Sequence, residues 1–408
     1  MIDPRTLGFD PARLARIGPF IDEAFVNKGK IAMSQLLVAR YGQEVYRHQS
    51  GVARADGTPL RDDAIFRIAS MTKPVTAIAF MTLVEEGRIS LEDPVHKVIP
   101  EFRNLGVYNG GGGAVPFMPT KPCAPMRMVD LLTHMSGLTY GFQNRSSVDA
   151  AYREALPDGG RGIAGFDHFI AELARISLEF APGTAWNYSV STDVLGVVVA
   201  RLAGKPLGEV FKERIFDPLG MPDTGFTLAE QKRDRLTDCW AYVPGGKPRL
   251  IDEAANSTLT EPARFEGGGG GLQSTLEDYH RFCRMLVGNG TADGVQIVSP
   301  KTIALMTSNF LPGGQDLTAL SRSLFSEANN AGTGFGLGFG VTIDPVRALV
   351  PGSVGEYFWG GMFSTAFFVD PVEKIHMVFM TQLSPSGAYP IRRQLKTLIY
   401  SALTESHT

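Results

Sequence analysis

The spacing of apolar residues near the N-terminus predicts a helix followed by a hairpin. Residues 10–26 carry apolar side chains at helical spacing, which is typical of a helix with one buried face. Residues 35–40 and 44–49 are strand-like, and the turn residues 41–43 separate them. The pattern therefore indicates a helix and two antiparallel strands at this end of the chain.

The C-terminal end shows a similar pattern. Residues 356–359, 365–370 and 375–381 are rich in aromatic and β-branched residues, as strands are. A helical pattern over residues 391–403 closes the chain. Glycine alternates with larger residues over 332–340, which predicts one further strand with a bare face.

The middle of the chain differs from both ends. From about residue 76 to residue 250 the apolar spacing is mostly helical, and the connections are long and rich in Gly and Pro. We therefore predict an α+β fold with an antiparallel sheet flanked by terminal helices. The sheet domain is predicted from residues 1–75 and 265–408, and residues 76–264 are predicted to form a mainly helical inserted domain.

Composition and charge exclude several classes of protein. With 44% hydrophobic and 20% charged residues, the 408-residue chain can bury a large core. The formal net charge is −3 and no long run of like charges occurs, so neither nucleic acid nor an anionic membrane is an expected partner. The N-terminus has no apolar segment of signal-peptide type, and we expect a soluble cytoplasmic protein.

The residues that commonly hold metals or phosphates are not arranged to do so. The three cysteines lie far apart and the histidines form no HExxH motif, so free thiols are expected and a zinc site is not. The glycine runs 110–113 and 267–271 do not lead into GK[ST], which argues against nucleotide binding. The second run is interpreted as a turn before a helix that opens with a capping box at residues 274–277.

The segment 66–87 carries the most informative chemistry. Residues 77–84 are apolar on nearly every side, so this helix is expected to be buried. Pro74 cannot lie deep inside a helix, and the helix must begin within a few residues of it. Ser70 is therefore predicted at the N-terminal end of a buried helix, with Lys73 one turn further on.

This arrangement can activate a serine. Residues i and i+3 share a helix face, so the Lys73 amine can reach the Ser70 hydroxyl. The free N–H groups at the helix start can stabilise an oxyanion that forms when Ser70 attacks a carbonyl. The same positive end and the apolar surroundings predict a lowered pKa for Lys73, which would then serve as a base.

The same residues also have a structural interpretation. About one Ser-x-x-Lys is expected by chance in a chain of this length, and Ser70 could be a helix cap with Lys73 as an exposed charge. Context favours catalysis, because this is the only Ser-x-x-Lys in the sequence and it opens an unusually apolar helix.

Four motifs resemble those of the serine β-lactamase and penicillin-binding protein superfamily, in particular its class C-like branch. They occur in the family's order and are Ser70-Met71-Thr72-Lys73, the segment LLTHMSGL at 131–138, the tyrosine motif WNYSVSTDVLG at 186–196, and Trp359-Gly360-Gly361. No GxSxG motif occurs, so an α/β-hydrolase triad is not expected.

Two departures from the pattern change the expected substrate. Class C β-lactamases have Tyr-x-Asn where this chain has Tyr188-Ser189-Val190, and Lys-Thr-Gly where it has Trp359-Gly360-Gly361. An indole replaces the cation that would hold a substrate carboxylate, so uncharged esters are favoured over carboxylated lactams. This combination resembles family VIII carboxylesterases most closely.

The resemblance implies roles for individual residues. Ser70 is implied as the nucleophile, Lys73 as the group that takes its proton, and Tyr188 as base or proton shuttle that protonates the leaving alcohol. Which of Lys73 and Tyr188 is the formal base stays open, because coupled groups share their titration. The backbone N–H groups of Ser70 and Met362 are implied as the oxyanion hole, with no metal and no organic cofactor.

Further residues near the motifs are candidates for contact with the substrate. Trp359 is interpreted as either a substrate wall or a packing residue, with Gly360 and Gly361 beside the substrate. Tyr140 and Phe142 follow the second motif and are predicted to line an acyl pocket. The resemblance gives His134 no catalytic role, and we expect it to be a hydrogen-bonded structural residue.

The expected function is hydrolysis of short-chain carboxylic esters through an acyl-enzyme on Ser70, with weak β-lactam hydrolysis also allowed. The alternatives are a β-lactamase or D-alanyl peptidase-like hydrolase, an acyltransferase, and a catalytically silent binding protein of the same fold. The expected partner is a small-molecule ester. The sequence determines neither acyl preference nor oligomeric state.

Overall fold

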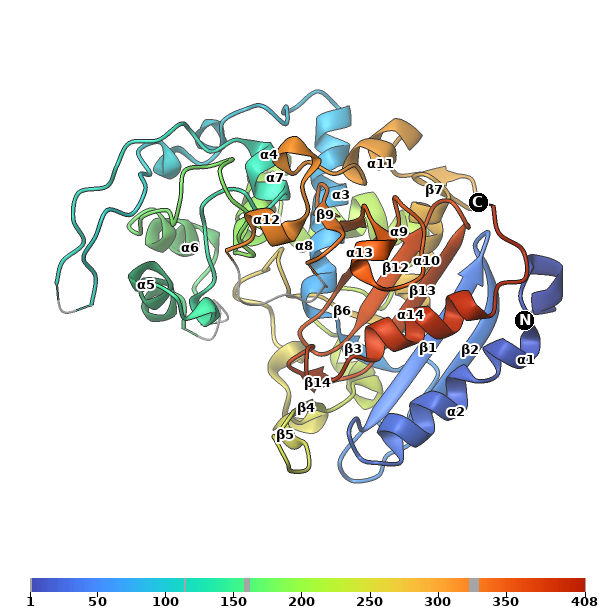
Figure 1. The fold of residues 1–408 in the computed structure, drawn as a ribbon. Helices are drawn as coiled ribbons and strands as arrows, with labels where there is room; N and C mark the ends of the chain where they lie inside the picture. Colours follow the sequence, from blue (N-terminus) through green and yellow to red (C-terminus); the bar gives the residue numbers. More distant parts are fainter. Residues whose placement is uncertain (1, 114, 158–161, 323–329, 408) are drawn as a thin grey trace.

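The computed structural model describes residues 2–113, 115–157, 162–322 and 330–407 (Figure 1). Its strands, in chain order, are β1 (Met33–Arg40), β2 (Gln43–Gly51), β3 (Ile65–Arg67), β4 (Cys239–Ala241), β5 (Arg249–Asp252), β6 (Gln273–Thr275), β7 (Thr291–Ala292), β8 (Val295–Gln296), β9 (Thr333–Phe335), β10 (Gly340–Thr342), β11 (Tyr357–Gly360), β12 (Ala366–Asp370), β13 (Ile375–Met380) and β14 (Leu383–Ser384). Its α-helices are α1 (Pro11–Leu14), α2 (Ile17–Ile21), α3 (Thr72–Glu85), α4 (Met128–Leu132), α5 (Ser147–Ala155), α6 (Phe166–Leu173), α7 (Ser191–Ala203), α8 (Leu207–Phe211), α9 (Asp217–Leu219), α10 (Leu276–Val287), α11 (Pro300–Met306), α12 (Leu317–Leu320), α13 (Pro345–Ala348) and α14 (Ile391–Ser401).

Strands from both ends of the chain form one sheet. In the described residues it has seven strands in the order β2-β1-β13-β12-β11-β10-β9, and every neighbouring pair is antiparallel. The join between the two ends is the pairing of β1 with β13, where Gln35 lies opposite Met380. The predicted α+β fold with an antiparallel sheet from both chain ends is confirmed.

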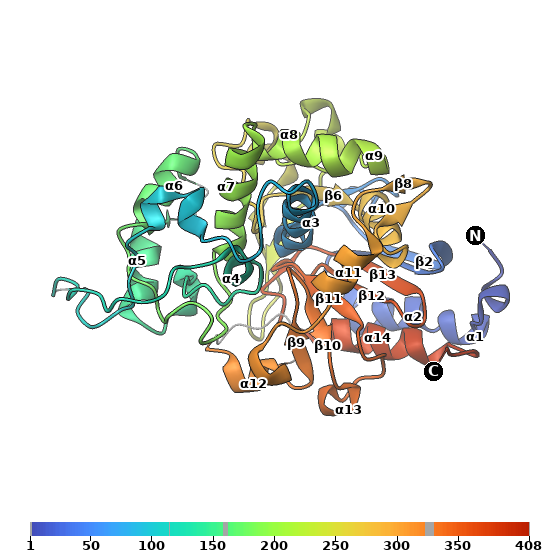
Figure 2. The ribbon, with the colours of Figure 1, turned by 90° about the horizontal axis from the view of Figure 1, so that it is seen from above.

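Helices cover both faces of this sheet. The terminal helices α1, α2 and α14 lie on one face, where α14 contacts both α1 and α2 (Figure 1). On the other face α10 contacts β1, β12 and β13. Beyond α10 lies the helical middle of the chain, in which α3 contacts α7 and α8 (Figure 2). The boundaries of the two predicted domains stay a prediction.

The predicted terminal elements are present, with local differences. The helical stretch at 10–26 is divided into α1, α2 and a π-helical turn, Asp22–Val26. The predicted continuous strand at 332–340 is wrong. It is a hairpin of β9 and β10, because the chain turns at Gly338, which has φ +91°. A period of two indicates extended backbone but does not show where the chain reverses.

The N-cap of α10 lies one residue later than the predicted capping box at residues 274–277 places it. Thr275, not Ser274, is the N-cap, and its hydroxyl accepts a hydrogen bond from the Asp278 N–H at 3.0 Å. Ser274 belongs to β6, which pairs with β3. In the described part of the chain, none of the helices combines the length and apolar character needed to cross a lipid bilayer.

Candidate active site

Ser70 lies in a 3₁₀ turn, η3 (Ala69–Met71), which joins β3 to α3. The side chains of α3 are buried from Thr72 to Leu83, and the helix packs against α7, α8 and the π-helical turn Lys212–Phe216. Ser70 is half-buried and Lys73 is 1% exposed. The structure thus places the serine and the lysine at the N-terminal end of a buried helix, as the sequence predicts.

The backbone directly before Ser70 is held in an unfavourable conformation. Ala69 has φ +44°, in the left-handed region that residues with a Cβ rarely adopt. The Thr72 hydroxyl donates to the Ala69 carbonyl at 2.7 Å and accepts from the Leu272 N–H at 3.2 Å. Contacts from α3 and from the chain before β6 therefore fix the turn that presents Ser70.

Lys73 reaches the serine and two further oxygen atoms. Its Nζ donates to Ser70 Oγ at 3.2 Å, to the Tyr140 hydroxyl at 3.1 Å and to the Gly269 carbonyl at 2.6 Å. The amine also lies 4.6 Å from the centre of the Tyr188 ring, within range of a cation–π contact. These three hydrogen bonds all end on uncharged oxygens, and the predicted i to i+3 contact with Ser70 is present.

Tyr188 is the second partner of the serine. Its hydroxyl donates to Ser70 Oγ at 2.6 Å. It lies in the loop before α7 and is 3% exposed, with its ring packed against His134 and Trp359 at centre distances of 5.1 and 5.6 Å. The structure thus brings together Ser70, Lys73 and Tyr188, the three residues that the sequence motifs implied.

A buried carboxylate behind Lys73 was not among the predicted site residues. Asp193, in the first turn of α7, accepts a hydrogen bond from the Tyr140 hydroxyl at 3.3 Å and one from the Gly269 N–H at 2.9 Å. Burial raises the pKa of Asp193, and the nearby Lys73 opposes that rise. An acidic residue in the first turn of an otherwise apolar helix is the sequence signal that could find it.

The glycine run 267–271 contributes to the site as well as forming a turn. Its turn is present, with the Gly270 N–H donating to the Gly267 carbonyl at 3.1 Å. Within it, Gly268 accepts from the Thr76 hydroxyl at 2.7 Å and Gly269 accepts from Lys73. The interpretation as a turn was therefore incomplete, because the carbonyl groups of a glycine run leave no side-chain signal in the sequence.

The His134 ring packs against the Tyr188 ring. The His134 side chain is 1% exposed, and its Nδ1 lies 3.3 Å from the Ser189 hydroxyl. Burial, followed by the charge of Lys73, holds the pKa of His134 well below its ordinary value, so the imidazole is neutral at pH 7. This agrees with the expected structural role, because the ring fixes Tyr188 by packing.

The end of β11 lies against the segment that carries Ser70. β11 contacts η3, and a Cβ on Gly361 would collide with the Ile68 carbonyl, two residues before Ser70. Met362 follows and is 41% exposed. This close approach is what an oxyanion hole made of the Ser70 and Met362 N–H groups requires.

The Trp359 side chain is buried against other aromatic rings. Its side chain is 5% exposed, and its ring lies 5.4 Å from that of Phe335 in addition to the contact with Tyr188. These contacts fit the packing interpretation of Trp359. The side chain also lines a cavity of about 120 Å³, and its role as a substrate wall stays a prediction.

Tyr140 and Phe142 are not placed as a simple acyl pocket. The Tyr140 hydroxyl joins Lys73 to Asp193, and Phe142, 50% exposed, stacks on the Tyr140 ring at 4.9 Å. A cavity of about 400 Å³ has other lining residues, which include Phe226, Leu259, Phe265, Gly270, Gly271 and Phe363. It adjoins the nucleophile turn, since Ala69 packs with Phe363.

The described residues contain no group of three or more His, Cys, Asp or Glu side chains placed to hold a metal ion. Instead, the site combines a serine hydroxyl with an amine and a phenol that both contact it. This set of groups can move one proton away from Ser70 Oγ and return it, which is the requirement for acyl transfer through a serine.

Comparison with known proteins agrees with this geometry. The Beta-lactamase family model matches residues 21–400, so the chain belongs to the beta-lactamase family. It is 37% identical over 333 residues to Protein Rv1367c of Mycobacterium tuberculosis, covering 81% of this chain and 80% of that protein. It is 30% identical over 418 residues to Esterase EstB of Burkholderia gladioli, covering 98% of each.

A solved structure extends the comparison. EstCE1, described as a hydrolase with promiscuous acyltransferase activity, superposes with a TM-score of 0.80 at 26% identity, over 95% of this chain and 99% of that chain. Within the superfamily the chain therefore lies near the family VIII esterases. It is a serine hydrolase with a β-lactamase fold, of the esterase or acyltransferase type.

Proposed function

We propose that this protein is a carboxylesterase that hydrolyses short-chain carboxylic esters through an acyl-enzyme on Ser70. The single observation that carries the proposal is the convergence of two proton-transfer groups on one oxygen. Tyr188 OH lies 2.6 Å and Lys73 Nζ lies 3.2 Å from Ser70 Oγ.

The proposed reaction has two halves. Ser70 Oγ loses its proton to the pair formed by Lys73 and Tyr188 and bonds to the ester carbonyl carbon. The N–H groups of Ser70 and Met362 stabilise the oxyanion. When the carbon–oxygen bond breaks, Tyr188 protonates the leaving alcohol. Water then attacks the acyl-enzyme, gives its proton to the same pair, and releases the acid and free Ser70.

The substrate is proposed to be an uncharged ester. Trp359 occupies the position where the resemblance expects a cation, so a substrate carboxylate gains no ion pair there. The nucleophile remains available to a lactam carbonyl, and we expect slow nitrocefin turnover. The 400 Å³ cavity beside the nucleophile turn is proposed to hold the larger part of the ester, since it has both apolar and polar walls.

The test is a panel of p-nitrophenyl acetate, p-nitrophenyl butyrate and nitrocefin, measured on wild type, Ser70→Ala and Ser308→Ala. Ser308 is an exposed serine just after α11 and serves as the matched control. We expect the wild type and Ser308→Ala to cleave both esters and Ser70→Ala to cleave neither. Absence of ester cleavage by the wild type, or equal rates for Ser70→Ala, would show the proposal to be wrong.

Placement of the substrate has its own test. Ala263 is exposed and lines the cavity, so Ala263→Trp should fill part of it without disturbing the core. We expect kcat/KM to fall more for long acyl or alcohol groups than for p-nitrophenyl acetate. Ala255→Trp, at an exposed alanine outside the lining residues, should change neither. Equal effects of the two substitutions would place the ester elsewhere.

Acyl transfer to an alcohol is a second candidate, and it is supported by the description of EstCE1. An acyl-enzyme on Ser70 reacts with any acceptor that reaches it, so an added alcohol would compete with water. Product analysis with p-nitrophenyl butyrate and added alcohol measures the ratio of new ester to free acid, and a ratio that stays at zero rejects this candidate.

A further inference from the structure

The turn after β11 is bonded from the side opposite to Ser70 by an arginine of α14. The Arg392 Nη2 atom donates to the Gly361 carbonyl and to the Thr365 carbonyl, both at 2.8 Å. These are the two ends of the turn that carries Met362. The turn also closes on itself, since the Gly361 N–H donates to the Thr365 carbonyl at 2.9 Å.

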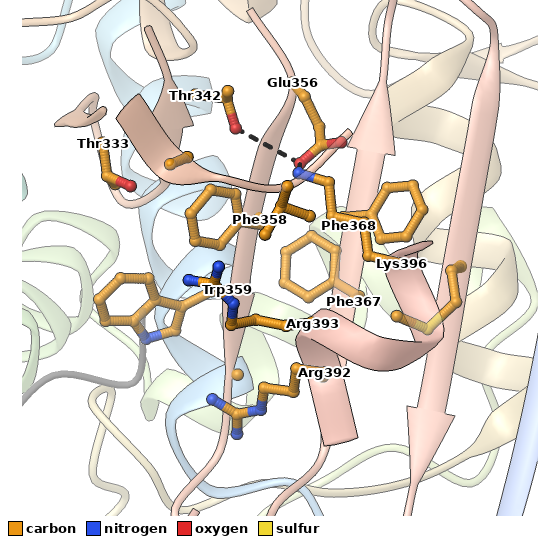
Figure 3. Close-up of a pocket in the computed structure, with 15 residues that line it drawn as sticks. Thr333, Thr342, Glu356, Phe358, Trp359, Phe367, Phe368, Arg392, Arg393 and Lys396 are labelled. Carbon is orange, nitrogen blue, oxygen red and sulfur yellow. Dashed lines mark hydrogen bonds and ion pairs between the residues drawn. The ribbon is translucent and has the colours of Figure 1, made fainter. Parts of the chain in front are cut away.

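The guanidinium lies directly against the strand. A Cβ on Gly360 would lie 2.5 Å from Arg392 Cζ, so a side chain at this position would displace the guanidinium. Figure 3 shows Arg392 beside β11, below Trp359, at the edge of a cavity on the α14 face of the sheet. The arginine is thus one reason for a glycine at position 360, and the predicted contact of Gly360 with substrate stays a prediction.

The opposite side of the turn meets the nucleophile segment. Gly361 lies against the Ile68 carbonyl, to which the Thr365 hydroxyl also donates at 3.4 Å. The turn is thus held between the backbone before Ser70 and the Arg392 guanidinium. A shift of either would change the position of the Met362 N–H relative to Ser70.

The bond to Gly361 has an electronic consequence as well. The carbonyl of Gly361 and the N–H of Met362 belong to the same peptide group. A cationic donor on that carbonyl draws electron density towards the oxygen and makes the N–H a stronger donor, because hydrogen bonds through one peptide polarise each other. The charge acts on the N–H without contacting the substrate.

We propose that Arg392 is a positioning residue for catalysis, which orients and polarises the Gly361–Met362 peptide so that the Met362 N–H can stabilise the oxyanion. The proposal rests on the proposed function of Ser70. It names a residue from outside the sequence motifs and on the far face of the sheet.

The test compares Arg392→Ala and Arg392→Lys with Arg393→Ala on p-nitrophenyl butyrate. Arg393 is the neighbouring residue of α14, is exposed, and donates to the Leu349 carbonyl, so it is a matched control. Removing a whole oxyanion donor costs about 10²–10³ in kcat, so weakening one should cost Arg392→Ala about tenfold to a hundredfold. We expect KM to stay nearly constant, Arg392→Lys to retain part of the activity, and Arg393→Ala to match wild type.

Chemical rescue separates positioning from a general effect on folding. The missing guanidinium would leave a space that opens into the cavity of about 120 Å³ lined by Phe358, Gly360 and Arg393. Millimolar guanidinium chloride, compared with sodium chloride, should raise kcat of Arg392→Ala but not of wild type or Arg393→Ala.

Each outcome decides the proposal. A fall in kcat at constant KM with guanidinium rescue supports it. Unchanged kcat in Arg392→Ala overturns it, as does a loss that guanidinium does not reverse. If the wild type cleaves no ester, or Ser70→Ala equals it, the proposed function fails instead, so the two failures are distinguishable.

Discussion

Two lysines that are largely shielded from water have nearly opposite surroundings in this protein. Lys73, on α3, donates to the Ser70 hydroxyl, the Tyr140 hydroxyl and the Gly269 carbonyl. Lys396, on α14, forms an ion pair with Glu356 Oε1 at 2.5 Å. In these contacts the partner of Lys396 is a carboxylate, and the partners of Lys73 are two hydroxyls and a carbonyl.

Each lysine nevertheless has a buried carboxylate nearby. Burial raises the pKa of Asp193 and of Glu356, and in each case the neighbouring lysine opposes the rise. Glu356 contacts its lysine, whereas Asp193 is linked to Lys73 through the Tyr140 hydroxyl and through the N–H and carbonyl groups of Gly269. Neutral groups connect Lys73 to Asp193, so Lys73 can exchange a proton with Ser70 without breaking these links. Lys396, in contrast, is held directly by the Glu356 carboxylate.

The largest expected difference between the two lysines is the effect of their replacement on kcat. Lys73→Met removes a group that contacts the nucleophile, and we expect kcat for p-nitrophenyl butyrate to fall about 10⁴-fold, as when one member of a catalytic group is lost. Lys396→Met should leave kcat unchanged, because its ion pair lies on the α14 side of the sheet, away from Ser70. Comparable losses of kcat in the two variants would contradict the comparison.

The second prediction concerns the stability that the ion pair of Lys396 supplies. Lys396→Met leaves the Glu356 carboxylate buried without its cation, so we expect the free energy of unfolding to fall by about 3 kcal/mol. Urea denaturation at pH 7 measures it. Replacing Glu356 by Gln in the same variant should restore part of the loss, and a double variant no more stable than Lys396→Met would show that the charge is not the cause.

The cost of Lys396→Met should also depend on pH. Without the lysine, the already raised pKa of Glu356 rises further above its ordinary value of 4.5. Below pH 4.5 the carboxyl is protonated in folded and unfolded chains alike, so no charge is buried. The penalty should therefore stay constant up to the raised folded pKa that Glu356 has in wild type. It should then grow by about 1.4 kcal/mol per pH unit up to the higher folded pKa of the variant, and level off above that. Urea denaturation between pH 4 and pH 8 tests this, and a constant penalty would contradict it.

The smallest effect on kcat is expected from removing the Tyr140 hydroxyl, which lies between Lys73 and Asp193. Tyr140→Phe removes the hydroxyl that links them but keeps the ring, so we expect kcat to fall about tenfold, the value of one hydrogen bond to a charged group. Tyr108→Phe, which loses a hydroxyl bonded to the Gly111 carbonyl away from the site, is the control and should match wild type. An unchanged kcat in Tyr140→Phe would mean that the link has no catalytic role.

The parts of the site that could be predicted are those with a local pattern. Ser70 and Lys73 are three residues apart on one helix, and helical geometry alone brings them together. The strands at both ends were visible because their apolar and β-branched residues are continuous. Tyr188 has no local relation to Ser70 and was predicted only through the family's tyrosine motif.

The remaining contacts depend on long-range packing. Asp193, Gly269 and Arg392 meet the site only after segments far apart in sequence have packed together, and each of them makes at least one contact there that involves a backbone group. Tyr140 was assigned to a substrate pocket because it follows a motif, which stays a prediction. Its hydrogen bonds with Lys73 and Asp193 could not be predicted, because position beside a motif does not determine which groups a side chain contacts. The hairpin at 332–340 was missed for a similar reason, since alternation alone does not locate a reversal.

The pairing of β1 with β13 sets the order in which activity can arise during synthesis. The ribosome releases β1, β2 and the nucleophile helix early, yet β1 has no partner on its inner edge until the last strands emerge. The turn that carries Met362 and the arginine that holds it are translated later still than the helical middle. A growing chain therefore contains Ser70 long before it contains Met362 and Arg392, which are proposed to stabilise the oxyanion. It becomes an enzyme only near the end of translation.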